Sequence, residues 1–360
     1  MKETPLNRIH KALGARMVEF AGWQMPVQYE SALQEHFAVR QAAGLFDVSH
    51  MGRFRIRGEQ ALNLIQRVTS NDAGRLSDGQ AQYSGLLNPS GGFVDDIIVH
   101  RLAANEYMIC VNASRREADL AWFLEHRRED VAVIDESDET AQIAVQGPKA
   151  QEILQPLTTV PLPEIKRYWF REGDISGARG LIARTGYTGE DGFELYLPAE
   201  SAEKTWNSLL ELGRPAGMRP AGLAARNTLR LEMKYPLYGN DIDGTTTPFE
   251  AGLGWIVKLN KPDFVGKPAL VRQKEAGIQR TLAGFELIDP GIARDHCPVW
   301  IDDRAVGNVT SGSYSPSLEK SIGLVYLPPE SAIPGQRLGI EVRGKRLAAQ
   351  VVETPFYGRK

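Results

Sequence analysis

The chain has 360 residues, of which 42% are hydrophobic and 24% charged, with a formal net charge of -3. This length predicts two or three domains of ordinary globular composition, and the charge gives no support for nucleic-acid binding. No apolar run is long enough to span a bilayer, so we expect no membrane partner. Its only cysteines, Cys110 and Cys297, fit no metal-binding spacing. They favour a reducing compartment, for which a bacterial cytoplasm is the simplest fit.

The N-terminal segment predicts little regular structure before the first helix. Residues 1–17 have no apolar core, so they form no secretory signal, and the motif-bearing part follows too closely for a removable transit segment. Because residues 4–30 are rich in polar and aromatic side chains, we expect an extended lead-in. The apolar spacing then predicts helices over 32–43 and 59–68, with a strand over 54–57 between them.

A pair of carboxylates, Asp95 and Asp96, interrupts the apolar run over 93–99, which predicts a strand. Neighbouring strand residues point to opposite faces, so only one of the two can face what the strand buries. A buried carboxylate is costly unless something pairs with it, and a ligand with positive charge or N–H donors could do so. The alternative is that both carboxylates are solvated at the end of a hairpin.

A further strand is predicted over 107–111, and it ends at Asn112. Ser114 and Glu117 have the spacing of a capping box, which predicts a helix starting there and running to His126. Local chemistry alone leaves Asn112 as a turn residue or as a functional side chain before the cap.

The stretch from Gly186 to Leu195 is the second informative one. Its glycines allow positive φ or a close approach to a ligand, and Tyr187 offers an aromatic face. Glu194 lies within a strand predicted over 193–197, again a carboxylate in an apolar run. Further short strands are predicted over 131–134, 142–145 and 181–185, and helices after Pro148 and over 201–212.

Residues 220–232 predict a helix on which Arg226 and Arg230 share a face. Both arginines could be solvated, and Arg230 could pair with Glu232 or with other residues. Residues 233–275 contain many turns and aromatic side chains, as expected for a segment that covers a site or packs between domains.

From residue 279 the pattern changes to short β-runs separated by turns, which predicts a small barrel or sandwich. The runs cover residues 282–287, 298–301, 307–310, 321–326, 337–342 and 348–352.

Six motifs occur in order along the chain: Phe20-Ala21-Gly22-Trp23, Phe46-Asp47-Val48-Ser49-His50-Met51, Ser90-Gly91-Gly92-x-x-Asp95-Asp96, Thr185-Gly186-Tyr187-Thr188-Gly189-Glu190-Asp191-Gly192, Leu223-Ala224-Ala225-Arg226-x-Thr228-Leu229-Arg230-Leu231-Glu232 and Thr310-Ser311-Gly312-x-x-Ser315-Pro316. The ordered set resembles the T protein, or aminomethyltransferase, of the glycine cleavage system. The resemblance runs from Thr4 to Tyr357.

The resemblance implies an α+β fold, a three-domain cloverleaf with two α+β domains and a C-terminal β-barrel around a central folate channel. Residues 1–50 with 142–245 would form the first domain, 51–141 with 246–278 the second, and 279–360 the barrel.

It also implies a reaction. The carbon of an aminomethyl group on the lipoyl arm of the H protein passes to tetrahydrofolate, giving 5,10-methylenetetrahydrofolate, ammonia and the dihydrolipoyl arm. The implied partners are the lipoylated H protein and tetrahydrofolate as co-substrate. The resemblance implies no metal, nicotinamide or flavin.

Three residues match the main functional positions of the family. Asp95 matches the essential carboxylate beside the reacting folate nitrogens, where an anion can stabilise an iminium-like carbon. Glu194 matches the carboxylate that binds the N–H edge of the pterin, and Arg226 a folate-contacting arginine. With Asp95 facing the channel, Asp96 is expected to face away.

Four further residues match contact positions of the family, namely Met51, Asn112, Tyr187 and Tyr357. Tyr187 would pack against the folate rings. Asn227 departs from the family, which usually has Asp after the arginine, and this removes a charge next to Arg226.

Related functions on the same fold are the alternatives. A folate-dependent demethylase is one. Flavin-linked dimethylglycine and sarcosine dehydrogenases are disfavoured, because no G-x-G-x-x-G follows an N-terminal strand. Non-catalytic folate-binding proteins of iron–sulfur cluster assembly carry a reactive cysteine in a K-G-C-Y-x-G-Q-E-like motif, whereas Cys297 here lies in Asp295-His296-Cys297-Pro298.

Overall fold

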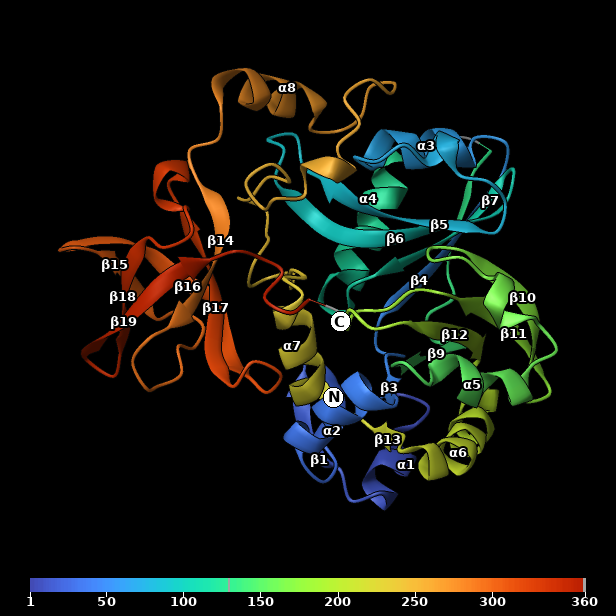
Figure 1. Cartoon of the computed structure of the whole chain (residues 1–360). Coiled ribbons are helices and arrows are strands. Elements are labelled where there is room, and N and C mark those ends of the chain that lie inside the picture. The colour runs from blue at the N-terminus through green and yellow to red at the C-terminus, as the bar shows by residue number, and fades with distance from the viewer. Residues whose placement is uncertain (129, 359–360) are drawn as a thin grey trace. The chain divides into compact units, whose positions relative to one another are not determined.

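The computed structural model describes residues 1–128 and 130–358 (Figure 1). The chain divides into two compact units, each assembled from separated segments. Unit 1 comprises Met1–Val68, Asp72–Ser84 and Asp96–Arg226. Unit 2 comprises Thr69–Asn71, Gly85–Asp95 and the chain from Asn227 onward. The three domain boundaries expected from the sequence stay a prediction.

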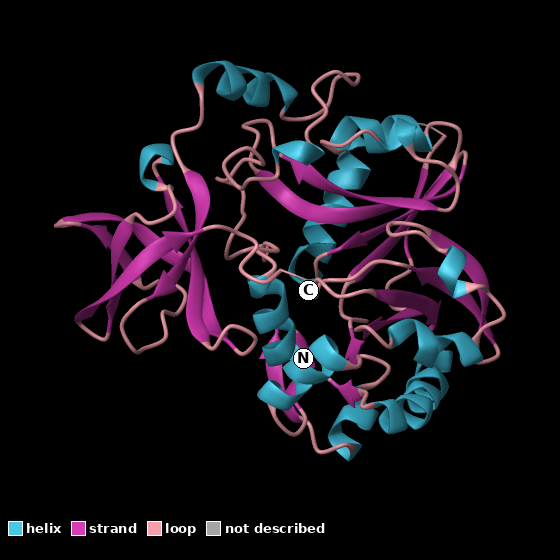
Figure 2. Ribbon diagram, in the orientation of Figure 1, coloured by secondary structure: helices cyan, strands magenta, loops and turns pink. Residues whose placement is uncertain are grey.

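Unit 1 contains a six-stranded sheet in the order β10-β11-β12-β9-β3-β13, antiparallel except for the parallel pair β3 and β13. The strands are β3 (Gly44–Asp47), β9 (Thr140–Gln146), β10 (Phe170–Ile175), β11 (Ala178–Ala183), β12 (Gly192–Pro198) and β13 (Arg219–Pro220). The helices of this part are α1 (Asn7–Ala12), α2 (Ala32–Gln41), α5 (Ala150–Leu154) and α6 (Ala202–Gly213). Helix α5 contacts β12 and β9, and α6 contacts β9 (Figure 2). The buried Trp206 of α6 belongs to the core that also contains residues of these strands.

Strand β12 shows how this sheet presents a carboxylate. Phe193, Leu195 and Leu197 enter the core that contains Trp206. Because side chains alternate along a strand, Glu194 and Tyr196 lie on the opposite face. The strand pattern therefore buries one face completely and leaves Glu194 at a half-buried position on the other.

A second sheet has five strands in the order β5-β6-β7-β4-β8, and its pairs β6–β7, β7–β4 and β4–β8 are antiparallel. They are β4 (Gly52–Arg57), β5 (Gln80–Leu87), β6 (Phe93–Ala103), β7 (Glu106–Val111) and β8 (Ala132–Asp135), and the associated helices are α3 (Ala61–Val68) and α4 (Arg116–His126). Residues 85–95, which join the ends of β5 and β6, belong to unit 2.

Unit 2 contains a closed six-stranded barrel in the order β14-β17-β16-β15-β18-β19, drawn in orange to red in Figure 1. Its strands are β14 (Thr281–Leu287), β15 (Pro298–Ile301), β16 (Arg304–Ser315), β17 (Lys320–Leu327), β18 (Arg337–Val342) and β19 (Lys345–Val352). Helix α8 (Lys267–Ala276) precedes the barrel, and α7 (Leu223–Glu232) begins in unit 1 and ends in unit 2. The predicted α+β class with a C-terminal barrel is confirmed.

Two expectations about local structure are wrong. Residues 4–30 are not extended and irregular, because they form α1 and a hairpin of β1 (Arg16–Phe20) and β2 (Trp23–Gln28). The predicted capping box does not form, since α4 begins at Arg116 after a 3-10 turn and has no side-chain cap. Helix α8 was not predicted from the sequence. Among the described residues, no helix is long and apolar enough to cross a membrane.

Candidate functional site

Glu194 is held by hydrogen bonds from two other segments of unit 1. Gln142 on β9 donates through Nε2 to Glu194 Oε1 at 3.0 Å, and Thr185 donates through Oγ1 to Glu194 Oε2 at 2.5 Å. Burial raises the pKa of Glu194, whereas these two hydrogen bonds and the charge of Arg226 act in the opposite direction. The carboxylate is thus oriented and near a cation while its side chain remains half-buried.

Arg226 lies over an aromatic ring. Its guanidinium carbon is 4.7 Å from the centroid of the Tyr187 ring, a cation–π distance. Both side chains are half-buried. The structure therefore brings together Glu194, Arg226 and Tyr187, three residues that the family resemblance assigns to folate.

The glycine-rich loop after β11 is shaped by close contacts. A Cβ on Gly186 would lie 1.9 Å from Gln146 Oε1, so a larger residue there requires the Gln146 side chain to move. Gly189 has φ +84°, a conformation that L side chains rarely adopt. Tyr187 therefore lies between a glycine in close contact with Gln146 and a glycine with positive φ.

A second cluster surrounds Asp96. Asn112 donates through Nδ2 to Asp96 Oδ1 at 2.8 Å and to the Asp96 carbonyl oxygen at 3.1 Å. Tyr83 donates its hydroxyl to Asp96 Oδ2 at 2.9 Å. Both carboxylate oxygens of Asp96 therefore have a fixed neighbour, and the Asp96 side chain is half-buried.

The two carboxylates of β6 lie on opposite faces of the strand. Along this strand Phe93, Asp95 and Ile97 are buried, and Asp95 is 0% exposed. Asp96, on the opposite face, is the carboxylate that contacts Asn112. Strand alternation correctly separates the two side chains, but it does not say which face each one takes. Asp95 belongs to unit 2, whereas the residues of the two clusters belong to unit 1.

The two clusters interact electrostatically. Burial raises the pKa of Tyr83 well above its usual value, with further contributions from Asp96 and from Tyr187. Tyr187 in turn lies under Arg226, whose charge acts on Glu194. Asp96, Tyr187 and Glu194 are therefore linked within unit 1, and we call this set the carboxylate–tyrosine site.

Met51 lies at the end of a turn in which its N–H donates to the Val48 carbonyl oxygen at 3.1 Å. Arg53 donates to the Met51 carbonyl oxygen at 2.5 Å, so the backbone next to this half-buried methionine is fixed. The neighbouring His50 is 1% exposed, and its ring nitrogens have no hydrogen-bond partner among the described residues. Burial, with the charge of Arg226, lowers the pKa of His50 to about 3.

The second half of α7 is anchored inside unit 2. Arg230 donates to Asp241 Oδ2 at 2.6 Å and to Asn227 Oδ1 at 2.8 Å. Glu232 accepts hydrogen bonds from Ser315 at 2.5 Å and Ser317 at 2.9 Å. Arg230 therefore pairs with Asp241, one of the other partners left open by the sequence, and it also contacts Asn227.

Tyr357 lies in unit 2, where its backbone N–H donates to the Glu232 carbonyl oxygen at 3.0 Å.

Cys110 lies on the other side of Gln142 from Glu194, with its thiol donating to Gln142 Oε1 at 3.5 Å. Burial and the charge of Glu194 raise the pKa of this thiol to about 12.

Sequence reasoning missed Thr185, Gln142 and Tyr83 as partners of the carboxylates. Thr185 opens the glycine-rich motif, and Gln142 is a polar residue at the start of a predicted strand. The sequence therefore marks both as polar residues that could contact a ligand or a carboxylate. Tyr83 lies on β5, a strand that the sequence did not predict.

Among the described residues, no group of three or more His, Cys, Asp or Glu side chains is placed to hold a metal ion.

Two family descriptions match the chain. The GCVT N-terminal domain matches residues 6–261, and the glycine cleavage T-protein C-terminal barrel domain matches residues 280–358. Aminomethyltransferases of Desulfitobacterium hafniense and Desulforamulus reducens are 46% and 49% identical to it, each over 100% of this chain and 99% of the relative.

A solved structure has the same fold. The crystal structure of glycine cleavage system aminomethyltransferase T from Bartonella henselae is similar with a TM-score of 0.93 and 34% identity, covering 99% of this chain and 98% of that one. The residues of the carboxylate–tyrosine site thus occur in a chain whose sequence and fold agree with one family over nearly their whole length. The chain belongs to the T-protein, or aminomethyltransferase, family of the glycine cleavage system.

Proposed function

We propose that this chain transfers the aminomethyl carbon from the lipoyl arm of an H protein to tetrahydrofolate. The carbon leaves the arm's sulfur and its own nitrogen and becomes bonded to two folate nitrogens. The products are 5,10-methylenetetrahydrofolate, ammonia and the dihydrolipoyl arm. The single observation that best supports this proposal is the half-buried Glu194 carboxylate, oriented by Gln142 and Thr185 and close to Arg226.

Glu194 and Arg226 suit the two polar edges of a pterin. The aminopyrimidine edge presents adjacent N–H donors, which a carboxylate can accept together, and the carbonyl edge suits a guanidinium fork. Tyr187 offers its ring to both the guanidinium and the ligand. Tetrahydrofolate would therefore be recognised by hydrogen bonds at its edge and by packing on its face.

Asp96 is the carboxylate that we assign to the reacting carbon, in place of the sequence-based choice of Asp95. Its two oxygens are held by Asn112 and Tyr83, and its side chain keeps partial exposure, whereas Asp95 is completely buried. A fixed anion stabilises positive charge on the carbon as ammonia leaves, and it costs no reorganisation at that moment.

The remaining expected contacts belong to the same proposal. Met51 and Asn112 would line the folate site in unit 1, and Tyr357 is a further contact that the family resemblance implies. A cloverleaf arrangement around a central folate channel, with lipoylated H protein as the donor, is what the family membership implies for this chain.

The deciding experiment is single-turnover formation of methylenetetrahydrofolate from aminomethylated H protein and tetrahydrofolate. Tetrahydrofolate binding is measured in parallel by calorimetry and by the shift in melting temperature, because a ligand that binds only the native state stabilises it. We expect both binding and transfer. Binding without transfer would favour a folate-dependent demethylase or a non-catalytic folate protein, and absence of binding would contradict the proposal itself.

The iron–sulfur alternative gains no support from the cysteines. A reactive cysteine needs a thiolate, and the raised pKa of Cys110 keeps its thiol protonated near neutral pH. Cys297 lies in unit 2 with its side chain half-buried, outside the carboxylate–tyrosine site.

A further inference from the structure

Unit 1 contains a cavity of about 420 Å³. None of the residues assigned to folate above lines this cavity. Nine residues line it: Leu13, Tyr29, Glu30, Glu35, Arg214, Gly217, Met218, Arg219 and Pro220. They come from the ends of α1 and β2, the start of α2, and the segment from the end of α6 to β13. The cavity is therefore built where several chain segments of one unit end.

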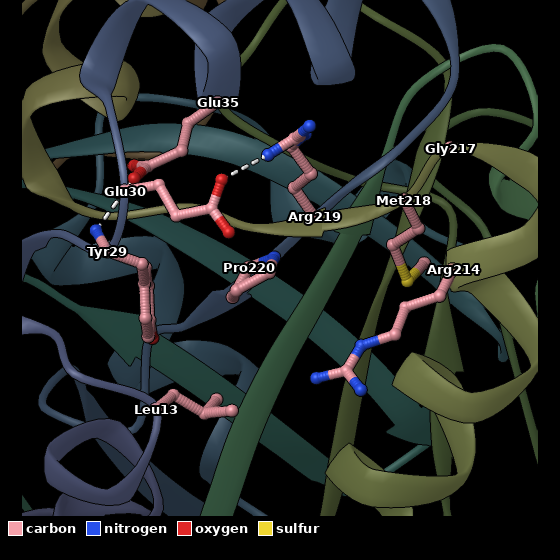
Figure 3. Close-up of a pocket in the computed structure, with 9 residues that line it drawn as sticks. All are labelled: Leu13, Tyr29, Glu30, Glu35, Arg214, Gly217, Met218, Arg219 and Pro220. Atoms are coloured by element: carbon pink, nitrogen blue, oxygen red, sulfur yellow. Dashed lines mark hydrogen bonds and ion pairs between the residues drawn. The ribbon is translucent and has the colours of Figure 1, made fainter.

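The apolar part of the lining is well packed. Met218 is 2% exposed and belongs to the same core as Trp206. Leu13 and Tyr29 are half-buried and pack against that core. Pro220 completes this part (Figure 3). These four side chains offer a firm apolar surface to a ligand of drug-like size.

Three of the four charged lining residues already have partners. Glu30 pairs with Arg219 at 2.6 Å. Glu35 accepts the backbone N–H groups of Tyr29 at 2.7 Å and Gly222 at 2.9 Å. These contacts hold the wall together, so neither carboxylate needs a ligand.

Arg214 is the exception among these charges. It belongs to a 3-10 turn after α6, Arg214–Ala216, and is exposed. Its guanidinium makes no ion pair or hydrogen bond with any residue in the described ranges 1–128 and 130–358. Figure 3 shows it extending from beside Met218 toward the interior of the cavity, with Tyr29 on the other side.

We propose that this cavity is a second small-molecule site, which binds a small amphipathic carboxylate. The carboxylate pairs with the Arg214 fork, a geometry that suits two parallel N–H···O bonds. The apolar body of the ligand packs on Leu13, Met218, Pro220 and the Tyr29 ring. The site does not depend on folate or on aminomethyl transfer.

The test uses 3-phenylpropanoate as the probe and the methyl group of Met218 as the reporter. The full-length protein is labelled with ¹³C at its methionine methyl groups, and Met218→Leu assigns the signal. Titration should shift the Met218 signal saturably. The uncharged analogue 3-phenylpropan-1-ol should bind at least about fivefold more weakly, as should acetate, which lacks the apolar body.

Variants separate this site from others. Arg214→Gln should weaken probe binding by about fivefold, and Arg214→Lys, which keeps the charge, should weaken it less. The matched control is Arg337→Gln, since Arg337 is also exposed but lies on the barrel strand β18. Arg226→Gln and saturating tetrahydrofolate should leave probe binding unchanged, which distinguishes this cavity from the folate site.

Three results would overturn the proposal. They are an unshifted Met218 signal at saturating probe, equal affinity of Arg214→Gln and the unmodified protein, and equal affinity for the acid and the alcohol. Unfolding midpoints of all variants show whether a loss of binding reflects a loss of folding. Arg214 is exposed, so its substitution should leave the midpoint unchanged.

Discussion

One amide group fixes both the side chain and the backbone of Asp96: Asn112 Nδ2 lies 2.8 Å from Asp96 Oδ1 and 3.1 Å from the Asp96 carbonyl oxygen. Asn112 follows β7 directly, and β6 pairs with β7, so the contact joins two neighbouring strands. A carboxylate held in this way does not need to reorganise when positive charge develops beside it.

We therefore predict that Asp96→Asn lowers the rate of aminomethyl transfer by a factor of about 10² or more, the usual cost of losing one preorganised electrostatic group. Asp95→Asn should lower the unfolding midpoint and leave the transfer rate nearly unchanged, because Asp95 is 0% exposed. Single-turnover rates and unfolding midpoints of both variants decide between them. If Asp95→Asn loses the activity and Asp96→Asn keeps it, the sequence-based assignment to Asp95 is right and ours is wrong.

The second prediction concerns folate affinity. Glu194→Gln keeps the shape of the side chain but removes the charge offered to the pterin donors, so binding should weaken by about 1–3 kcal/mol. Calorimetry with tetrahydrofolate measures this change. The matched control is Glu172→Gln, since Glu172 forms an exposed pair with Arg179 on the same sheet and should not affect binding. Unchanged affinity in Glu194→Gln would show that the carboxylate is structural.

The third prediction is a pH dependence. Burial lowers the pKa of His50 to about 3 and that of His100 to about 4, whereas an unfolded histidine titrates near 6.5. The unfolded chain therefore binds more protons between these values, and stability falls as the pH falls through this window. Replacing His50 by Gln should make the loss less steep, by at most about 1.4 kcal/mol per pH unit.

Unfolding free energies from pH 7 to pH 4 test this expectation. The control is His296→Asn, because His296 is exposed and has a positive φ that Asn tolerates. If the unfolding free energy of His50→Gln falls with pH as steeply as that of the control, the His50 imidazole is not held neutral by the fold.

The fourth prediction concerns the anchoring of α7. Asp241→Asn should destabilise unit 2 by about 3–5 kcal/mol, because it leaves the charge of Arg230, which is 2% exposed, without its anionic partner. Denaturant unfolding measures the change. Asp303→Asn, in the exposed pair of Arg346 and Asp303, should cost no more than about 1 kcal/mol. Equal losses of unfolding free energy in the two variants would contradict the view that burial determines the cost of breaking an ion pair.

The barrel was predictable because short strands and turns are encoded locally. Six separated β-runs correspond to the six strands from β14 to β19, and the ends of β15 and β18 agree with the predicted ranges. The N-terminal hairpin was not predicted, because the only local mark of it in the sequence is its two-residue turn, and that turn has an unusual composition. Ala21 and Gly22 both have positive φ, as a type I′ turn requires, and Ala is an unusual residue in its first position.

The site could be predicted only in part, for a physical reason. The residues Glu194, Arg226 and Tyr187 follow from the family motifs, and the structure places them together. The partners of Glu194 come from segments that only the folded sheet brings close. For Asp95 and Asp96, the period of a strand gives two opposite faces, but the identity of each face depends on what packs there.

The burial of the Cys110 thiol has a consequence for thiol–disulfide exchange. Exchange between thiols and disulfides requires a thiolate to attack a sulfur, and the rate falls with the fraction of thiolate present. With its pKa raised to about 12 and its side chain buried, Cys110 presents almost no thiolate near neutral pH. A disulfide that reaches unit 1 is therefore not attacked by Cys110, and no mixed disulfide forms at this residue.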